Sequence, residues 1–264
     1  MVCAARAAQD ACMEALSRIL LLVERGEPVH LGVAKGLLLA RYTGASLDLY
    51  LCDTEPYQDF AVGGAGALEL ARESCLARGK AYLRSLQQCI LCSDVPIHAE
   101  AGCAASLARG LAERIARVPA QIVIRAAGIN ARLNFRDRGL LGQVPIPMLI
   151  TRGQPWRPAP RFAVIVDMGH SRDGAPCARL MHLCQLLGRR CGARVDFVSR
   201  NPGEPVSLMA QRDYDLIAVE HPRLSTAQGA GAGIVQDLSR ATAPDILFVP
   251  TVAETPDALL RMAG

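Results

Sequence analysis

Asp167, His170, Glu220 and His221 have the residue types and spacing that fit a catalytic or metal site best. Asp167 and His170 stand at the end of one apolar run, and Glu220 and His221 at the end of another. In an open parallel sheet, ligands bind at the carboxyl ends of strands where the strand order reverses. Two imidazoles and two carboxylates suit either a divalent metal ion or acid–base catalysis. The simpler interpretation is two solvated loops with common polar residues, so we assign neither a catalytic residue nor a metal site.

Three glycines in "QGAGAG" (228–233) are the second chemical candidate. Backbone N–H groups reach phosphate oxygens only where side chains are absent, and the start of a following helix favours an anion. Together with Asp167, the residues Gly229, Gly231 and Gly233 are therefore candidates for binding ATP or AMP. A loop leading to the last helix is the simpler interpretation of the same glycines.

Four arginines, Arg125, Arg132, Arg136 and Arg138, form a basic group after another apolar run. Arginine forks suit phosphate or carboxylate, but a charged helix face in solvent is the commoner explanation. The sequence contains no Walker loop, dinucleotide fingerprint or serine nucleophile motif. Its chemistry-bearing residues therefore define no known catalytic signature.

The ten cysteines do not indicate a disulfide framework. Cys177, Cys184 and Cys191 are spaced to share one helical face, where free cysteine behaves as a small hydrophobe. Cys89 and Cys92 have metal-ligand spacing, but no second pair accompanies them, so we expect no zinc site. Without a secretory signal, the expected compartment is the reducing cytoplasm.

Bulk properties exclude some partners. The net charge of +4 is mild, so we expect no nucleic-acid partner. No apolar run approaches the ~20 residues that a membrane-spanning helix needs. A chain of 264 residues has room for one large domain or for two of ordinary size.

Strand-like and helix-like stretches alternate along the first half of the chain. Continuous apolar runs predict strands buried on both faces, and apolar positions with a 3.6-residue period predict helices. This alternation indicates an α/β fold with a parallel sheet and right-handed crossovers. The predicted strands are 18–26, 46–53, 95–102, 121–128 and 147–152, and the predicted helices are 27–45, 68–90, 105–117 and 133–142.

The pattern starts again after "RGQPWRPAPR" (152–161), a linker by its proline content. Such an internal repeat predicts two similar domains, 17–152 and 160–252. The 13 residues of "NPGEPVSLMAQRD" are too few for the second helix and third strand of the repeat, so the second domain is predicted to be truncated. Its predicted elements are strands at 161–169, 194–199, 214–222 and 245–250, and a helix at 175–193.

This arrangement resembles the universal stress protein family in its tandem, UspE-like form. The resemblance is carried by first strands that end in an acid ("LLLVERG", "VIVDMG"), by "VPIPMLITR" and "APDILFVP", and by "QPW" after the fifth strand. It implies two tandem Rossmann-like (adenine nucleotide α-hydrolase-like) domains with strand order 3-2-1-4-5. It also implies that the two halves pair through their fifth strands, with a homodimer as a further arrangement.

Many members of this family bind ATP or AMP through a glycine pattern after the fourth strand. The pattern is Gly, two residues, Gly, nine residues, Gly, and then Ser or Thr. Counted from Gly128, the next two positions hold Ala131 and Leu141, and the second half retains only Gly233. Glu24 stands where an adenine-contacting aspartate ends the first strand. The motifs are therefore degenerate, and we expect no cofactor.

The predicted function is a non-catalytic stress-response protein that acts by binding partners. The first alternative is an ATP or AMP binder, or a slow ATPase, that uses Asp167 and the glycines of 228–233. The second is a metal-dependent enzyme at Asp167, His170, Glu220 and His221. The main prediction depends on the resemblance, because a fold does not determine a function.

Overall fold

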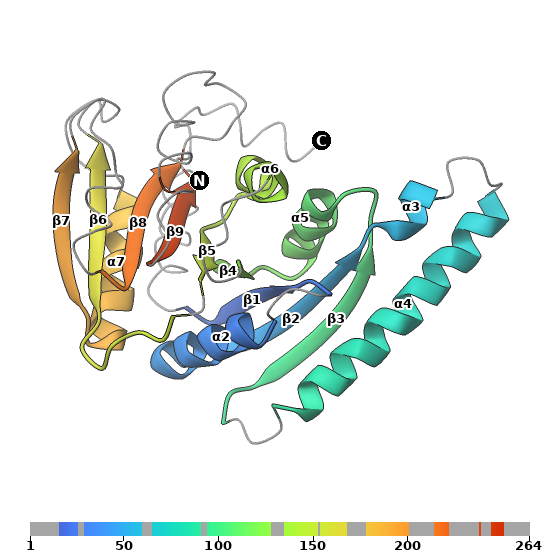
Figure 1. Cartoon of the computed structure of the whole chain (residues 1–264), viewed down its shortest axis with the longest axis horizontal. Helices are drawn as coiled ribbons and strands as arrows, with labels where there is room; N and C mark the ends of the chain where they lie inside the picture. Colours follow the sequence, from blue (N-terminus) through green and yellow to red (C-terminus); the bar gives the residue numbers. More distant parts are fainter. Residues whose placement is uncertain are drawn as a thin grey trace, which may run out of the picture.

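The computed structural model describes residues 16–25, 29–59, 65–90, 94–127, 135–152, 154–167, 178–200, 214–221, 238 and 244–250. Within them, one nine-stranded sheet runs in the order β3-β2-β1-β4-β5-β9-β8-β6-β7 (Figure 1). Six described helices accompany the strands. The predicted α/β class is confirmed. The domain limits 17–152 and 160–252 stay a prediction.

The first half of the sheet has the predicted strand order 3-2-1-4-5, and all its pairings are parallel. β1, β4 and β5 are short, mostly apolar runs buried along nearly their whole length, as expected for strands covered on both faces. β3, at the edge of the sheet, carries His98 and Glu100 and is partly exposed. The strands are β1 (Arg18–Val23), β2 (Ser46–Asp53), β3 (Ile97–Cys103), β4 (Ile122–Ala126) and β5 (Met148–Thr151).

The helices of this half follow the predicted pattern with small differences at their ends. Gly44 follows α2 with φ of +73°, a conformation that glycine adopts without strain. The short helix α3 was missed by the sequence analysis, because a single turn carries no periodic signal. The helices are α2 (Val29–Thr43), α3 (Glu55–Asp59), α4 (Ala65–Gln88), α5 (Leu107–Arg117) and α6 (Phe135–Gln143).

The second half adds four described strands and one described helix. Its strands pair in parallel with one another, and β9 pairs antiparallel with β5 of the first half. Figure 1 shows the sheet continuing across this junction. The elements are β6 (Arg161–Asp167), α7 (Ala178–Cys191), β7 (Arg194–Arg200), β8 (Leu216–His221) and β9 (Asp245–Pro250).

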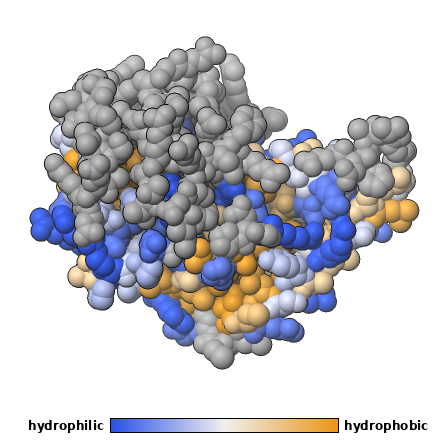
Figure 2. Space-filling view, in the orientation of Figure 1, coloured by the Kyte–Doolittle hydropathy of each residue, from blue (hydrophilic) through white to orange (hydrophobic). Residues whose placement is uncertain are grey.

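Two apolar layers lie on opposite faces of the sheet. One contains Leu39 of α2, Leu83 of α4 and Leu187 of α7, and the other contains Leu111 of α5 and Leu140 of α6. Each layer also includes strand side chains from both halves of the chain. Helices that turn their apolar sides inward leave their polar sides outward. Figure 2 accordingly shows hydrophilic residues over much of the described surface. It also shows a hydrophobic area near the lower centre.

The internal repeat is visible in matching ion pairs. Arg18, the first residue of β1, contacts Asp48, the third residue of β2, at 3.0 Å. Arg161, the first residue of β6, contacts Asp196, the third residue of β7, at 2.8 Å. The same two positions therefore carry the same contact in both halves.

Candidate functional site

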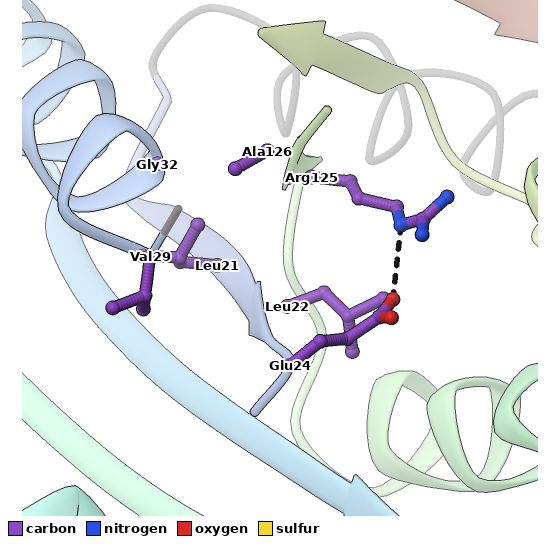
Figure 3. A pocket seen from close by; sticks show the side chains of 7 residues that line it. All are labelled: Leu21, Leu22, Glu24, Val29, Gly32, Arg125 and Ala126. Carbon is purple, nitrogen blue, oxygen red and sulfur yellow. Dashed lines mark hydrogen bonds and ion pairs between the residues drawn. The ribbon is translucent and has the colours of Figure 1, made fainter. Parts of the chain in front are cut away.

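A small crevice lies where the strand order of the first half reverses, at the carboxyl ends of β1 and β4. These strands are neighbours in the sheet, and the first turns of α2 form the third side. Ligands of open α/β sheets bind at this place. Figure 3 shows the seven residues that line it, Leu21, Leu22, Glu24, Val29, Gly32, Arg125 and Ala126.

A partly buried ion pair fills the polar end of this crevice. Arg125 Nε lies 2.9 Å from Glu24 Oε1, and the two side chains are only 3% and 15% exposed (Figure 3). The remaining cavity is about 10 Å³, on the scale where one water molecule needs about 10–15 Å³. Between the described residues that line it, the crevice has no space for a nucleotide base.

Gly32 has a packing role here. A Cβ on Gly32 would lie 2.9 Å from Leu21 Cδ1 and 3.2 Å from Ala126 Cβ. Only glycine therefore lets α2 pack closely onto β1 and β4 at this position. The sequence analysis did not single out this residue, because its role depends on the neighbouring strands.

The predicted acid–histidine set is described only in part. Asp167 ends β6, and Glu220 and His221 end β8, the neighbouring strand, so these strand ends lie at one edge as predicted. His170 and the glycines Gly229, Gly231 and Gly233 lie outside the described residues, as do the side chains of Asp167, Arg132, Arg136 and Arg138.

His221 lies among apolar side chains. It is 3% exposed, and its ring centroid is 6.0 Å from that of Phe248 in an edge-on arrangement. Burial lowers the pKa of His221, because desolvation disfavours the imidazolium. The small cavity beside it takes residues from both halves, among them Leu141 and Met148 of the first half. A buried neutral imidazole in this environment is suited to packing.

One group of potential metal ligands was not identified from the sequence. Ligand atoms of Asp53, Glu55 and Cys75 lie within 4.8 Å of one another. Arg25 is 3.2 Å from Asp53, and Arg78 is 2.8 Å from both Glu55 and the Cys75 sulfur. Burial raises the pKa of the Cys75 thiol, which disfavours the thiolate that a metal needs. Two arginines already neutralise the carboxylates, so the group fits a structural ion network better than a metal centre.

No helix among the described residues is long and apolar enough to span a membrane.

Comparison with solved structures identifies the fold. A protein from Pseudomonas aeruginosa UCBPP-PA14, named "Putative Universal Stress Protein", superposes with a TM-score of 0.66 at 17% identity. The alignment covers 90% of this chain and 95% of that one. A protein of unknown function from Pseudomonas aeruginosa PAO1 gives a TM-score of 0.65 at 16% identity, covering 95% and 96%.

A universal stress protein from Archaeoglobus fulgidus DSM 4304 gives a TM-score of 0.63 at 11% identity, covering 88% of this chain and 98% of that one. No protein-family model and no curated protein matches the chain in sequence. The chain therefore shares the Rossmann-like fold of universal stress proteins over most of its length.

Proposed function

We propose that the chain is a non-catalytic stress-response protein of the tandem universal stress type, and that its first half does not bind ATP. The fold supports the first part of this proposal, because two of the similar structures are universal stress proteins that align over nearly their whole length. A protein of this kind would act by binding partners.

The Glu24–Arg125 ion pair is the observation that carries the second part. Its atoms stand 2.9 Å apart at the carboxyl ends of β1 and β4, where a ligand of this fold would enter. A nucleotide would have to separate the buried Arg125 from the partly buried Glu24, and leaving a buried charge without its partner is costly. The missing glycines after β4 point the same way, since Ala131 and Leu141 occupy the phosphate-loop positions.

A second candidate is ATP or AMP binding, or slow ATP hydrolysis, by the second half. Arg125 is the fourth residue of β4, and the fourth residue of β8 is Val219. The second half therefore has no cation at the position from which Arg125 reaches Glu24. Asp167, with the glycines of 228–233, remains the candidate set for this activity.

ATP titration monitored by the melting temperature tests the proposal. A ligand at about 100 times its Kd adds about 2.7 kcal/mol to the stability, which corresponds to a rise of several degrees. We expect no such rise for the wild-type chain, and no release of phosphate from ATP. A rise that disappears in an Asp167→Asn variant would support binding by the second half. A rise that persists in that variant would contradict the proposal.

A further inference from the structure

A buried pair of opposite charges joins the two halves. Lys35 of α2 lies 2.9 Å from Asp245, the first residue of β9, and the two side chains are 5% and 1% exposed. The Lys35 ammonium also donates to the Gln154 carbonyl at 3.1 Å and lies 4.2 Å from the centre of the Trp156 ring. The pair therefore contacts both halves and the linker between them.

Asp245 accepts three further hydrogen bonds at the same place. Its carboxylate takes them from the Thr151 hydroxyl at 3.0 Å, the Arg152 N–H at 2.8 Å and the Trp156 indole N–H at 2.8 Å. Burial lowers the pKa of Lys35, and the charge of Asp245 opposes this effect. A charged Lys35 is thus stabilised here by the carboxylate that β9 brings.

The strand register allows the fifth strands of the two halves to be compared residue by residue. Met148 pairs with Val123, the second residue of β4. Ile246 pairs with Ile217, the second residue of β8. Met148 and Ile246 are therefore equivalent positions of the repeat.

The apolar part of the junction is nearly symmetric. Leu149 lies opposite Leu247, and these two residues occupy equivalent positions of the repeat. An approximate two-fold axis therefore passes between them. The same axis would let β5 pair with β5 of a second copy, Leu149 against Leu149. Met148 lies opposite Phe248 in the chain and would then lie opposite Ile150 of that copy. Both partners present apolar residues at these positions, so apolar character alone does not exclude the second copy.

The carboxylate breaks this symmetry. Asp245 precedes Ile246, so its equivalent in the first half is Pro147, which precedes Met148. A second copy of β5 would bring Pro147, which has no charge, to the place that Asp245 occupies. Lys35 would then be buried without a carboxylate.

The lysine breaks the symmetry in the same way. The glycines that follow α2 and α7, Gly44 and Gly192, are equivalent, and both have a positive φ, +73° and +62°. Nine residues before them stand Lys35 and Leu183. Leu183, the equivalent of Lys35, is buried and apolar. Pairing of β9 with β9 of a second copy would therefore bury Asp245 without its lysine.

We propose that the Lys35–Asp245 pair selects the partner of β5, so that β5 accepts β9 of the same chain and rejects β5 of a second copy. Either pairing of like with like buries an unmatched charge, whereas the pairing of β5 with β9 matches both. Removing one member of a buried pair is strongly unfavourable, and a buried polar contact that sets the register or the partner is the best-attested role of such pairs. This inference does not depend on the proposed function.

Refolding of the full chain with Leu149→Cys tests this proposal. In a β5–β5 dimer the two introduced thiols face each other and form an intermolecular disulfide, which peptide mass spectrometry distinguishes from bonds of the other cysteines. We expect Lys35→Met to raise the amount of this cross-linked dimer several-fold at high protein concentration. Arg41→Met is the matched control, because Arg41 is on the same helix and pairs with the exposed Asp94. It should leave the amount unchanged.

A second variant tests the same proposal in the opposite direction. Pro147→Asp supplies a carboxylate at the position equivalent to Asp245, so it should favour the β5–β5 dimer while Lys35 is kept. It also decides the question if Lys35→Met does not refold. A lower melting temperature without more cross-linked dimer than in Arg41→Met would mean that the pair only adds stability, and would overturn the proposal.

Discussion

Glu24 and Arg125 show how a single pair of side chains occupies the crevice between β1 and β4. The sequence analysis placed Glu24 at the acidic position of the first strand but grouped Arg125 with three other arginines as a basic face. The structure buries Arg125 against Glu24, 101 residues away in sequence. A contact between residues so far apart in sequence leaves no local signal. The sequence analysis could therefore single out both residues but could not predict that they pair.

His221 carries a prediction at the same scale. Its pKa in the folded chain is lowered from 6.5 by burial, so the unfolded chain binds the proton more readily. The contribution of His221 to stability should be present in full above pH 6.5 and should be lost as the pH drops through the folded pKa. Urea unfolding across this range measures the effect.

His221→Gln should remove that part of the pH dependence, whatever it does to the stability at neutral pH. His98→Gln, at an exposed position of β3, should keep the wild-type slope. Equal slopes in the wild type and His221→Gln would show that the imidazole is not desolvated.

Among the elements, strands were the most predictable and side-chain clusters the least. All nine strands of the described residues and the helices α2, α4, α5, α6 and α7 were predicted, with ends shifted by a few residues. The clusters of Asp53, Glu55 and Cys75 and of Lys35 and Asp245 were missed. They join separate elements, so their geometry follows from the packing of the sheet and not from residue spacing.

Asp48 is the test at this scale, because it links β1, β2 and α5. Its side chain, 1% exposed, contacts Arg18 at 3.0 Å and the buried Arg114 at 2.7 Å. Asp48→Asn would leave Arg114 with Glu100, 2.6 Å away, as its remaining carboxylate, so the loss should be smaller than the about 3–5 kcal/mol expected when a buried charge loses every partner. We expect a lower urea midpoint with an unchanged m-value.

Glu113→Gln is the comparison for Asp48→Asn, since its ion pair with Arg109 is exposed. Surface pairs contribute little, so this variant should unfold near the wild-type midpoint. A similar loss in both variants would show that burial does not determine the effect of Asp48.

For the whole molecule, the repeat explains how the sheet is built. Two similar halves form one sheet through the pairing of β5 with β9. Asp245 joins the halves by its contacts with Lys35 and Trp156. These contacts differ from the Arg–Asp ion pair that each half repeats. The first half has a closed crevice. The second half has Val219 at the position equivalent to Arg125.

Crystals of the chain soaked with AMP test the central claim, the closed first crevice, most directly. The account predicts that Glu24 and Arg125 stay paired and that no nucleotide density appears between β1 and β4. Adenylate density against Gly32 and Arg125, with the ion pair separated, would contradict it.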